Sequence, residues 1–140
     1  MTLDRDITVA ICARLGTIPG WVWSPDTPPV IGDVAVFYGA IPEAPDRAVG
    51  VRVYGGSDSV ELWAPTRRVQ IVCRGSRGDR GGADDLAGQV YAALQRWSGD
   101  GISVAARTFF APLGADTEGR EERSDNYHLV IDNLEARDHD

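Results

Sequence analysis

Few residues of this 140-residue chain combine a reactive side chain with a neighbour that could use it. The two histidines, His128 and His139, have no cysteine or carboxylate at a metal-ligand spacing and form no His-x-x-x-His pair. The two cysteines, Cys12 and Cys73, are too few for a disulfide framework or a four-ligand metal site. We therefore predict no catalytic residue, no metal and no cofactor, and expect that the protein is not an enzyme.

The glycine-rich run from Gly75 to Gly82 is the strongest competing signal, because it lies between a predicted strand and a predicted helix. Free backbone donors at a helix start favour an anion. The run nevertheless lacks the Lys-Ser/Thr ending of a nucleotide-binding loop, and Asp79, Asp84 and Asp85 would repel phosphate. A flexible connection is the favoured interpretation. A small enzyme, or a monomeric binding module, that uses this loop as an anion site is the alternative.

Aromatic residues outside the apolar stripes indicate a surface that contacts protein. Trp21, Trp23, Tyr54 and Trp63 lie in or beside predicted loops. Aromatic residues and arginine dominate protein interfaces, so these positions are interface candidates. An equally weighted interpretation is that Trp21 and Trp23 plug the end of the core.

The charge of the chain disfavours nucleic acid as a partner. All 14 basic residues are arginine, against 21 acidic residues, for a net charge of −7. Nine of those acidic residues and only three arginines lie between residues 116 and 140. An acidic surface repels phosphate backbones. The sequence shows no secretory apolar region and no run long enough to cross a membrane, so we expect a protein of the cytoplasm.

The elements that must position these residues follow from periodicity. Apolar residues at helical spacing predict a helix ending near Leu15 and a second one containing Ala83 to Leu94. Alternation predicts strands at 34–38, 49–54, 68–74, 102–110 and 127–131. Residues 20–32 form a Pro- and Trp-rich arm with no regular element, and 113–124 form a mobile loop. This indicates one α+β domain over 1–140, with a central antiparallel sheet flanked by two helices.

Three stretches together carry a resemblance to a known family. They are Pro45 to Gly56 (PDRAVGVRVYGG), Arg67 to Gly75 (RRVQIVCRG) and Ala83 to Leu94 (ADDLAGQVYAAL). With their Pro-Asp strand start, their Val-Gln-apolar-x-x-Arg strand and their Ala/Leu helix, they resemble the tail terminator proteins of long-tailed bacteriophages, also labelled minor capsid or tail completion proteins. The resemblance covers roughly residues 34 to 134.

The resemblance implies a virion protein of the tail and neck, assembled in the host cytoplasm. Such proteins form a ring, usually of six subunits, that stops growth of the tail tube and joins it to the head-side connector or stopper. DNA passes through the ring without specific binding. The family has no active-site residues to carry over. Another ring of the neck, such as a head-completion or stopper protein, or a tail-tube relative, is the closest alternative.

The expected sheet provides a physical reason for a ring. Its face opposite the core would expose Arg52, Tyr54, Arg68, Gln70 and Arg74, and at least one of its edges would stay open. We expect acidic residues from 116 onward to meet Arg67 and Arg68 of a neighbouring copy. The predicted interface residues are Trp21, Trp23, Arg52, Tyr54, Trp63, Arg67, Arg68, Glu118, Glu121 and Glu122.

Overall fold

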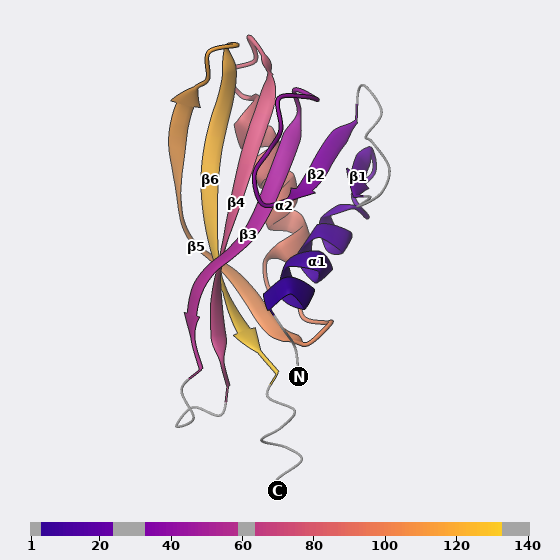
Figure 1. The fold of residues 1–140 in the computed structure, drawn as a ribbon, viewed down its shortest axis with the longest axis vertical. Coiled ribbons are helices and arrows are strands. Elements are labelled where there is room, and N and C mark those ends of the chain that lie inside the picture. Colours follow the sequence, from indigo (N-terminus) through magenta and orange to yellow (C-terminus); the bar gives the residue numbers. More distant parts are fainter. Residues whose placement is uncertain (1–3, 24–32, 59–63, 133–140) are drawn as a thin grey trace, which may run out of the picture.

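A six-stranded sheet carries both helices of the described chain (Figure 1). The computed structural model describes residues 4–23, 33–58 and 64–132. The strands lie in the order β1-β2-β3-β4-β6-β5. In chain order the elements are α1 (Asp4–Leu15), β1 (Trp21–Trp23), β2 (Val34–Tyr38), β3 (Ala48–Ser57), β4 (Thr66–Arg77), α2 (Gly82–Leu94), β5 (Ile102–Ala115) and β6 (Arg120–Ile131).

Both helices pack on the same face of the sheet, where they enclose one apolar core. α1 contributes Ile7, Ile11 and Leu15, and α2 contributes Leu86 and Val90. Alternate residues of the central strands point into the same cluster, as the period of a strand requires. These core residues are Val49, Val51, Val69, Ile71, Cys73, Tyr127 and Leu129. The other face of the sheet has no helix among the described residues, and we call it the open face.

The segment between β2 and β3, residues 39–47, crosses the open face instead of forming a helix, and we call it the crossing segment. In Figure 1 it runs in front of β3, while α2 lies behind β3 and β4. At Gly50 a Cβ atom would lie 2.3 Å from the carbonyl oxygen of Gly39, so this close crossing requires glycine. The crossing segment covers one end of the open face and leaves the rest exposed.

The α+β class and the two helices are confirmed, but the expected antiparallel sheet is only partly right. β3, β4, β6 and β5 pair antiparallel, whereas β1 pairs parallel to β2 and β2 pairs parallel to β3. The sheet is therefore mixed. The arm is also corrected at its start, since Trp21–Trp23 form β1. The rest of the arm, residues 24–32, lies outside the described residues.

The expected loop at 113–124 is mostly strand. β5 and β6 form a long hairpin in which Ala115 pairs with Glu121 and Pro112 with Arg123, leaving only 116–119 as the turn. Asp116 stabilises this turn by accepting hydrogen bonds from the backbone N–H groups of Glu118 and Arg120. The charged residues thus form the end of a β-hairpin whose turn is held by hydrogen bonds. Its mobility in solution stays a prediction.

Candidate subunit interface

β5 is the outermost strand on one side of the sheet, and it carries the most exposed apolar side chains of the described chain. Phe109 is 58% exposed, Phe110 51% and Leu113 56%. We call these three residues the β5 edge surface. It spans both faces of the sheet, because Phe110 pairs with Asp125 on the helix-bearing face and Phe109 pairs with Asn126 on the open face. Exposed apolar residues on an open strand edge mark an interaction site or an aggregation hazard.

The aromatic ring of Phe110 is held in place by arginines instead of core residues. The guanidinium of Arg123 lies 3.9 Å from its ring centroid, and that of Arg107 lies 4.8 Å from it. Both arginines donate to the fully buried carboxylate of Asp125, at 2.7 Å from Arg123 Nε and 3.2 Å from Arg107 Nη1. Arg107 also stacks on Tyr91 of α2 at 4.3 Å. This pre-ordering lowers the entropy cost of docking a partner there.

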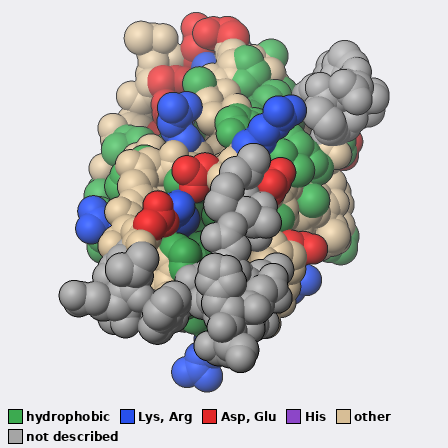
Figure 2. Space-filling model, turned by 60° about the horizontal axis from the view of Figure 1, so that its bottom comes forward, with side chains coloured by type: hydrophobic (Ala, Val, Ile, Leu, Met, Phe, Trp, Pro, Cys, Tyr) green, Lys and Arg blue, Asp and Glu red, His purple; other side chains and the backbone are tan. Residues whose placement is uncertain are grey.

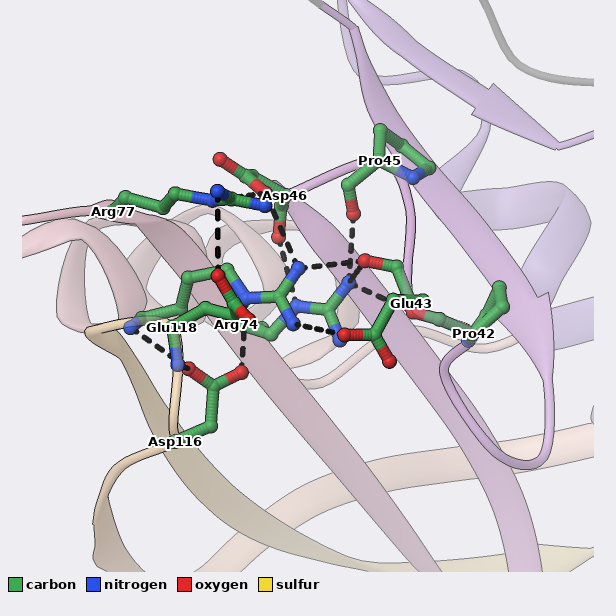
Figure 3. Close-up of polar contacts among 9 residues, drawn as sticks. Pro42, Glu43, Pro45, Asp46, Arg74, Arg77, Asp116 and Glu118 are labelled. Carbon is green, nitrogen blue, oxygen red and sulfur yellow. Dashed lines mark hydrogen bonds and ion pairs between the residues drawn. The ribbon is translucent and has the colours of Figure 1, made fainter.

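A buried arginine fixes the end of the hairpin to the crossing segment (Figure 3). The side chain of Arg120 is 3% exposed. Its Nε donates to Asp116 at 2.9 Å, and its Nη1 donates to the carbonyl of Glu43 at 2.6 Å and to the carboxylate of Asp46 at 3.1 Å. Arg77 reaches Asp46 from the other side at 3.3 Å.

Arg74 makes a second attachment beside the first. Its guanidinium donates to the backbone carbonyls of Pro42, Pro45 and Asp46 at 2.7–2.9 Å. Figure 3 shows this side chain enclosed by the crossing segment. Arg74 was expected on the exposed open face, and this expectation is wrong because the crossing segment covers it to 4% exposure.

The network lowers the pKa of two carboxyl groups. For Asp116 the main cause is the hydrogen bond from the backbone N–H of Arg120, with the Arg120 side chain adding to it. For Asp46, desolvation raises the pKa, but hydrogen bonds from Arg120 and Arg77 and their charges outweigh it. Both carboxylates are therefore favoured in their charged form, and the attachment weakens only in acid.

The open face carries a second cluster, which we call the open-face patch: Arg52, Tyr54 and Arg68. Arg52 and Arg68 are exposed and Tyr54 is 47% exposed. Among the described residues, no hydrogen bond, ion pair or ring contact involves the side chain of Arg52 or Arg68. Elsewhere charges are more evenly mixed, and Figure 2 shows acidic and basic side chains interspersed at one end of the molecule.

The predicted interface residues are placed very differently from one another. Trp21 is 5% exposed and its indole N–H donates to Gln89, so it belongs to the core, as the competing interpretation held. Trp23 is half-buried against the core, and Trp63 lies outside the described residues. Arg67 is occupied within the chain by Asp4 and Asp58, both at 2.6 Å.

The acidic candidates lie at the hairpin end. Glu118 pairs with Arg77 at 3.3 Å. Glu121 is half-buried and has no hydrogen-bond or ion-pair partner among the described residues. Glu122 is half-buried and its charge raises the pKa of Arg74, against the larger lowering by desolvation. Of the acidic candidates, Glu121 is thus the one whose charge is most available to a partner.

Sequence reasoning missed the β5 edge surface. It placed Phe110 on the alternating strand and Leu113 in a loop. The run Phe109 to Leu113, apolar beside a charged turn, was an available signal. Alternation misleads here because the β5–β6 register shifts between Ile102 and Val104, between Arg107 and Phe109 and between Pro112 and Gly114. Each such irregularity changes which face the following residues occupy.

The glycine run offers no open anion site. The carboxylate of Asp79 accepts the backbone N–H of Gly81 at the start of α2, so the chain supplies its own negative charge there. A Cβ atom on Gly75 would lie 2.9 Å from Gly82 and Ala83, which explains glycine at this strand–helix contact. Burial raises the pKa of the Cys12 thiol to about 12 and also raises that of Cys73, which makes both poor nucleophiles.

Two further properties of the described chain bear on function. Over 4–23, 33–58 and 64–132, no three His, Cys, Asp or Glu side chains are grouped so as to hold a metal ion. Within the same ranges, no helix has the length and hydropathy to span a bilayer.

Comparison with known proteins gives one family and one fold. The family model described as "Bacteriophage tail terminator protein" matches residues 15–133. Among solved structures, a chain of "Virion of native gene transfer agent (GTA) particle" is similar in fold, with a TM-score of 0.51 and 12% sequence identity. The similarity covers 86% of this chain and 83% of that one. No curated protein matches the sequence.

Proposed function

Because the chain belongs to the bacteriophage tail terminator family, we propose that it is a structural virion protein whose copies form a ring, of six subunits, at the head-side end of the tail tube. In this proposal the ring stops tube growth and contacts the tube protein on one side and the head-side connector or stopper on the other. DNA passes through it without being gripped, for which a net charge of −7 is suitable. Assembly takes place in the host cytoplasm.

The observation that carries the proposal is the β5 edge surface. Phe109, Phe110 and Leu113 are each more than half exposed, yet arginines anchored on a buried carboxylate order the ring of Phe110. The arginines neutralise the buried Asp125 within the chain, and their stacking also orders an aromatic ring that stays exposed to water. A neighbouring subunit would bury these side chains, and aromatic and arginine residues are the groups that contribute most to such contacts.

The contact must join two different surfaces if the assembly is to be a ring. A surface that pairs with itself gives a twofold dimer, whereas a head-to-tail contact closes into a ring when its rotation permits. The β5 edge surface and the open-face patch are two such different surfaces, and they lie on different parts of the sheet.

The experiment compares Phe109→Asp with Tyr38→Asp, a matched aromatic that is 48% exposed on β2. Native mass and negative-stain imaging of the wild type should show closed rings at rising concentration, alone or on purified tail tubes. We expect Phe109→Asp to abolish the rings, because it places a charge in an apolar contact. Tyr38→Asp should retain them. A wild type that stays monomeric in every condition, tubes included, would refute the ring.

The same samples separate the alternatives. Rings that cap isolated tubes and block further growth support a terminator, while rings that bind only the head-side connector support another neck protein. An enzyme that uses the glycine run is disfavoured because Asp79 occupies the helix start and because the family is a structural one.

A further inference from the structure

The open-face patch carries two arginine side chains that form no ion pair within the described residues of a strongly acidic chain. Arg52 and Arg68 have no acidic partner among the described residues, although the neighbouring Arg67 is paired with two aspartates. Grooves lie on both sides of Arg52: one is lined by Tyr54 and Arg67 together with Asp4 and Asp58, the other by Gln70 and Arg74 together with Glu122. Arginine and tyrosine beside hollows form a surface of the composition that binds a protein segment bearing carboxylates.

The hairpin end, residues 113–122, has the complementary composition. Leu113 is 56% exposed, and Glu121, a few residues away across the turn, has no partner among the described residues. Arg120 and Asp116 keep this end in one shape. The hairpin end thus offers an apolar side chain, Leu113, and a carboxylate unpaired within the described chain, Glu121. The open-face patch offers the complementary groups, a tyrosine ring and two guanidinium groups that are likewise unpaired there.

Glu121 of the hairpin end cannot reach Arg68 of the open-face patch within one chain. Arg68 pairs across the sheet with His128 of β6, which lies seven residues beyond Glu121 on the same strand. At the rise of an extended strand this separation is roughly 23 Å, more than the two side chains can span and well beyond the screening length of physiological salt. A contact between Glu121 and Arg68 must therefore join two molecules.

We propose that the open-face patch of one copy is the docking site for the hairpin end of the next copy, with Glu121 paired to Arg68 or Arg52 and Leu113 packed against Tyr54. This rests on the proposed ring and names the surface that the β5–β6 hairpin occupies in it. The hairpin lies across the neighbour's open face and does not extend the neighbour's sheet. The contact is head-to-tail, as a ring requires.

Charge exchange tests the pairing. We expect Arg68→Glu and Glu121→Arg each to raise the concentration needed for ring formation by about tenfold or more, because each puts like charges in contact. The double variant R68E/E121R, and an equal mixture of the two single variants, should recover most of that loss. Arg96→Glu, an exposed arginine with the same charge change and no described side-chain partner, is the control and should assemble like the wild type.

A cysteine pair gives an independent measurement that does not depend on charge. The native cysteines are buried, so the double variant Y54C/L113C should form disulfides between copies under mild oxidation and give a ladder of covalent oligomers. The control V9C/L113C should give none. Rings that form normally with Arg68→Glu and do not cross-link through Y54C/L113C would overturn the docking site while leaving the ring intact. Loss of tube or DNA binding with rings unchanged would overturn it as well, by assigning the patch to that partner.

Discussion

Arg120 joins two segments that lie far apart in the sequence, the β5–β6 hairpin turn and the crossing segment. It donates to Asp116 in the hairpin turn, to Asp46 at the end of the crossing segment and to the backbone of Glu43 within that segment. Arg77 contacts the same Asp46 from a side chain that is 58% exposed. The two arginines therefore share a partner but differ in burial, which allows the contribution of burial to be measured.

We predict that Arg120→Met lowers the midpoint of thermal unfolding much more than Arg77→Met does. Removing the buried arginine takes a side-chain donor from two carboxylates and from a carbonyl at a site closed to water, whereas water replaces most of what the exposed one supplies. Differential scanning calorimetry at pH 7 measures both. Equal effects of the two substitutions would contradict the structural role given to Arg120.

The same variants test how the contribution of Arg120 to stability depends on pH. The pKa of Asp46 and of Asp116 is lowered in the folded state, so their contribution to stability is present above the unfolded pKa of about 4 and disappears as pH falls through the folded value. The gap between wild type and Arg120→Met should therefore narrow as the pH falls below about 4. A gap that stays constant over this range would show that carboxylate pairing is not its source.

At the scale of elements, the crossing segment lies so close to β3 that only glycine fits at position 50. Gly50→Ala would bring a Cβ atom to 2.3 Å from the Gly39 carbonyl oxygen, forcing the segment off the sheet. We expect a loss of about 1–3 kcal/mol in the free energy of unfolding. Gly88→Ala on the exposed side of α2, where nothing lies within 4 Å, should instead stabilise by about 0.5–1 kcal/mol. Urea unfolding of both variants measures the contrast.

The strands that obey simple alternation were predictable, and the others were not. Val49 to Val53, Val69 to Cys73 and Tyr127 to Ile131 each bury one face, so their period of two is visible in the sequence. β1 has only three residues, too few to show a period of two. Its parallel pairing with β2 is a tertiary contact that has no local signature in the sequence. The exposed end of β5 and the charged start of β6 look like a loop in the sequence because glycine and charged residues replace the apolar alternation there.

The candidate interface was predictable by residue type more than by position. Arg52, Tyr54 and Arg68 lie on the open face as alternation indicated. The sequence does not distinguish Arg67 and Arg74 from these three residues, because the difference lies in tertiary contacts. Arg67 is paired with Asp4 and Asp58, and Arg74 is covered by the crossing segment. Trp21 was ambiguous for the same reason.

At the scale of the whole molecule, one open edge and one open face remain for neighbours to cover. We predict that outward-facing amides of β5 and the hairpin end exchange hydrogen rapidly in the isolated subunit and become protected on assembly. Amides of β4, which is paired on both sides, should be protected in both states. Hydrogen exchange with mass spectrometry distinguishes these regions. Strong protection of the outward-facing amides of β5 in a monomeric sample would contradict this prediction.

Pro112 and the three register shifts of β5 affect how unassembled subunits can associate with one another. Proline lacks the N–H that a continuous ladder needs, and each irregularity interrupts the flat edge that an identical strand could copy. An apolar edge so interrupted is a poor template for runaway fibril growth. We therefore expect the exposed apolar side chains of β5 to contact a neighbouring subunit of complementary shape and not an identical strand edge.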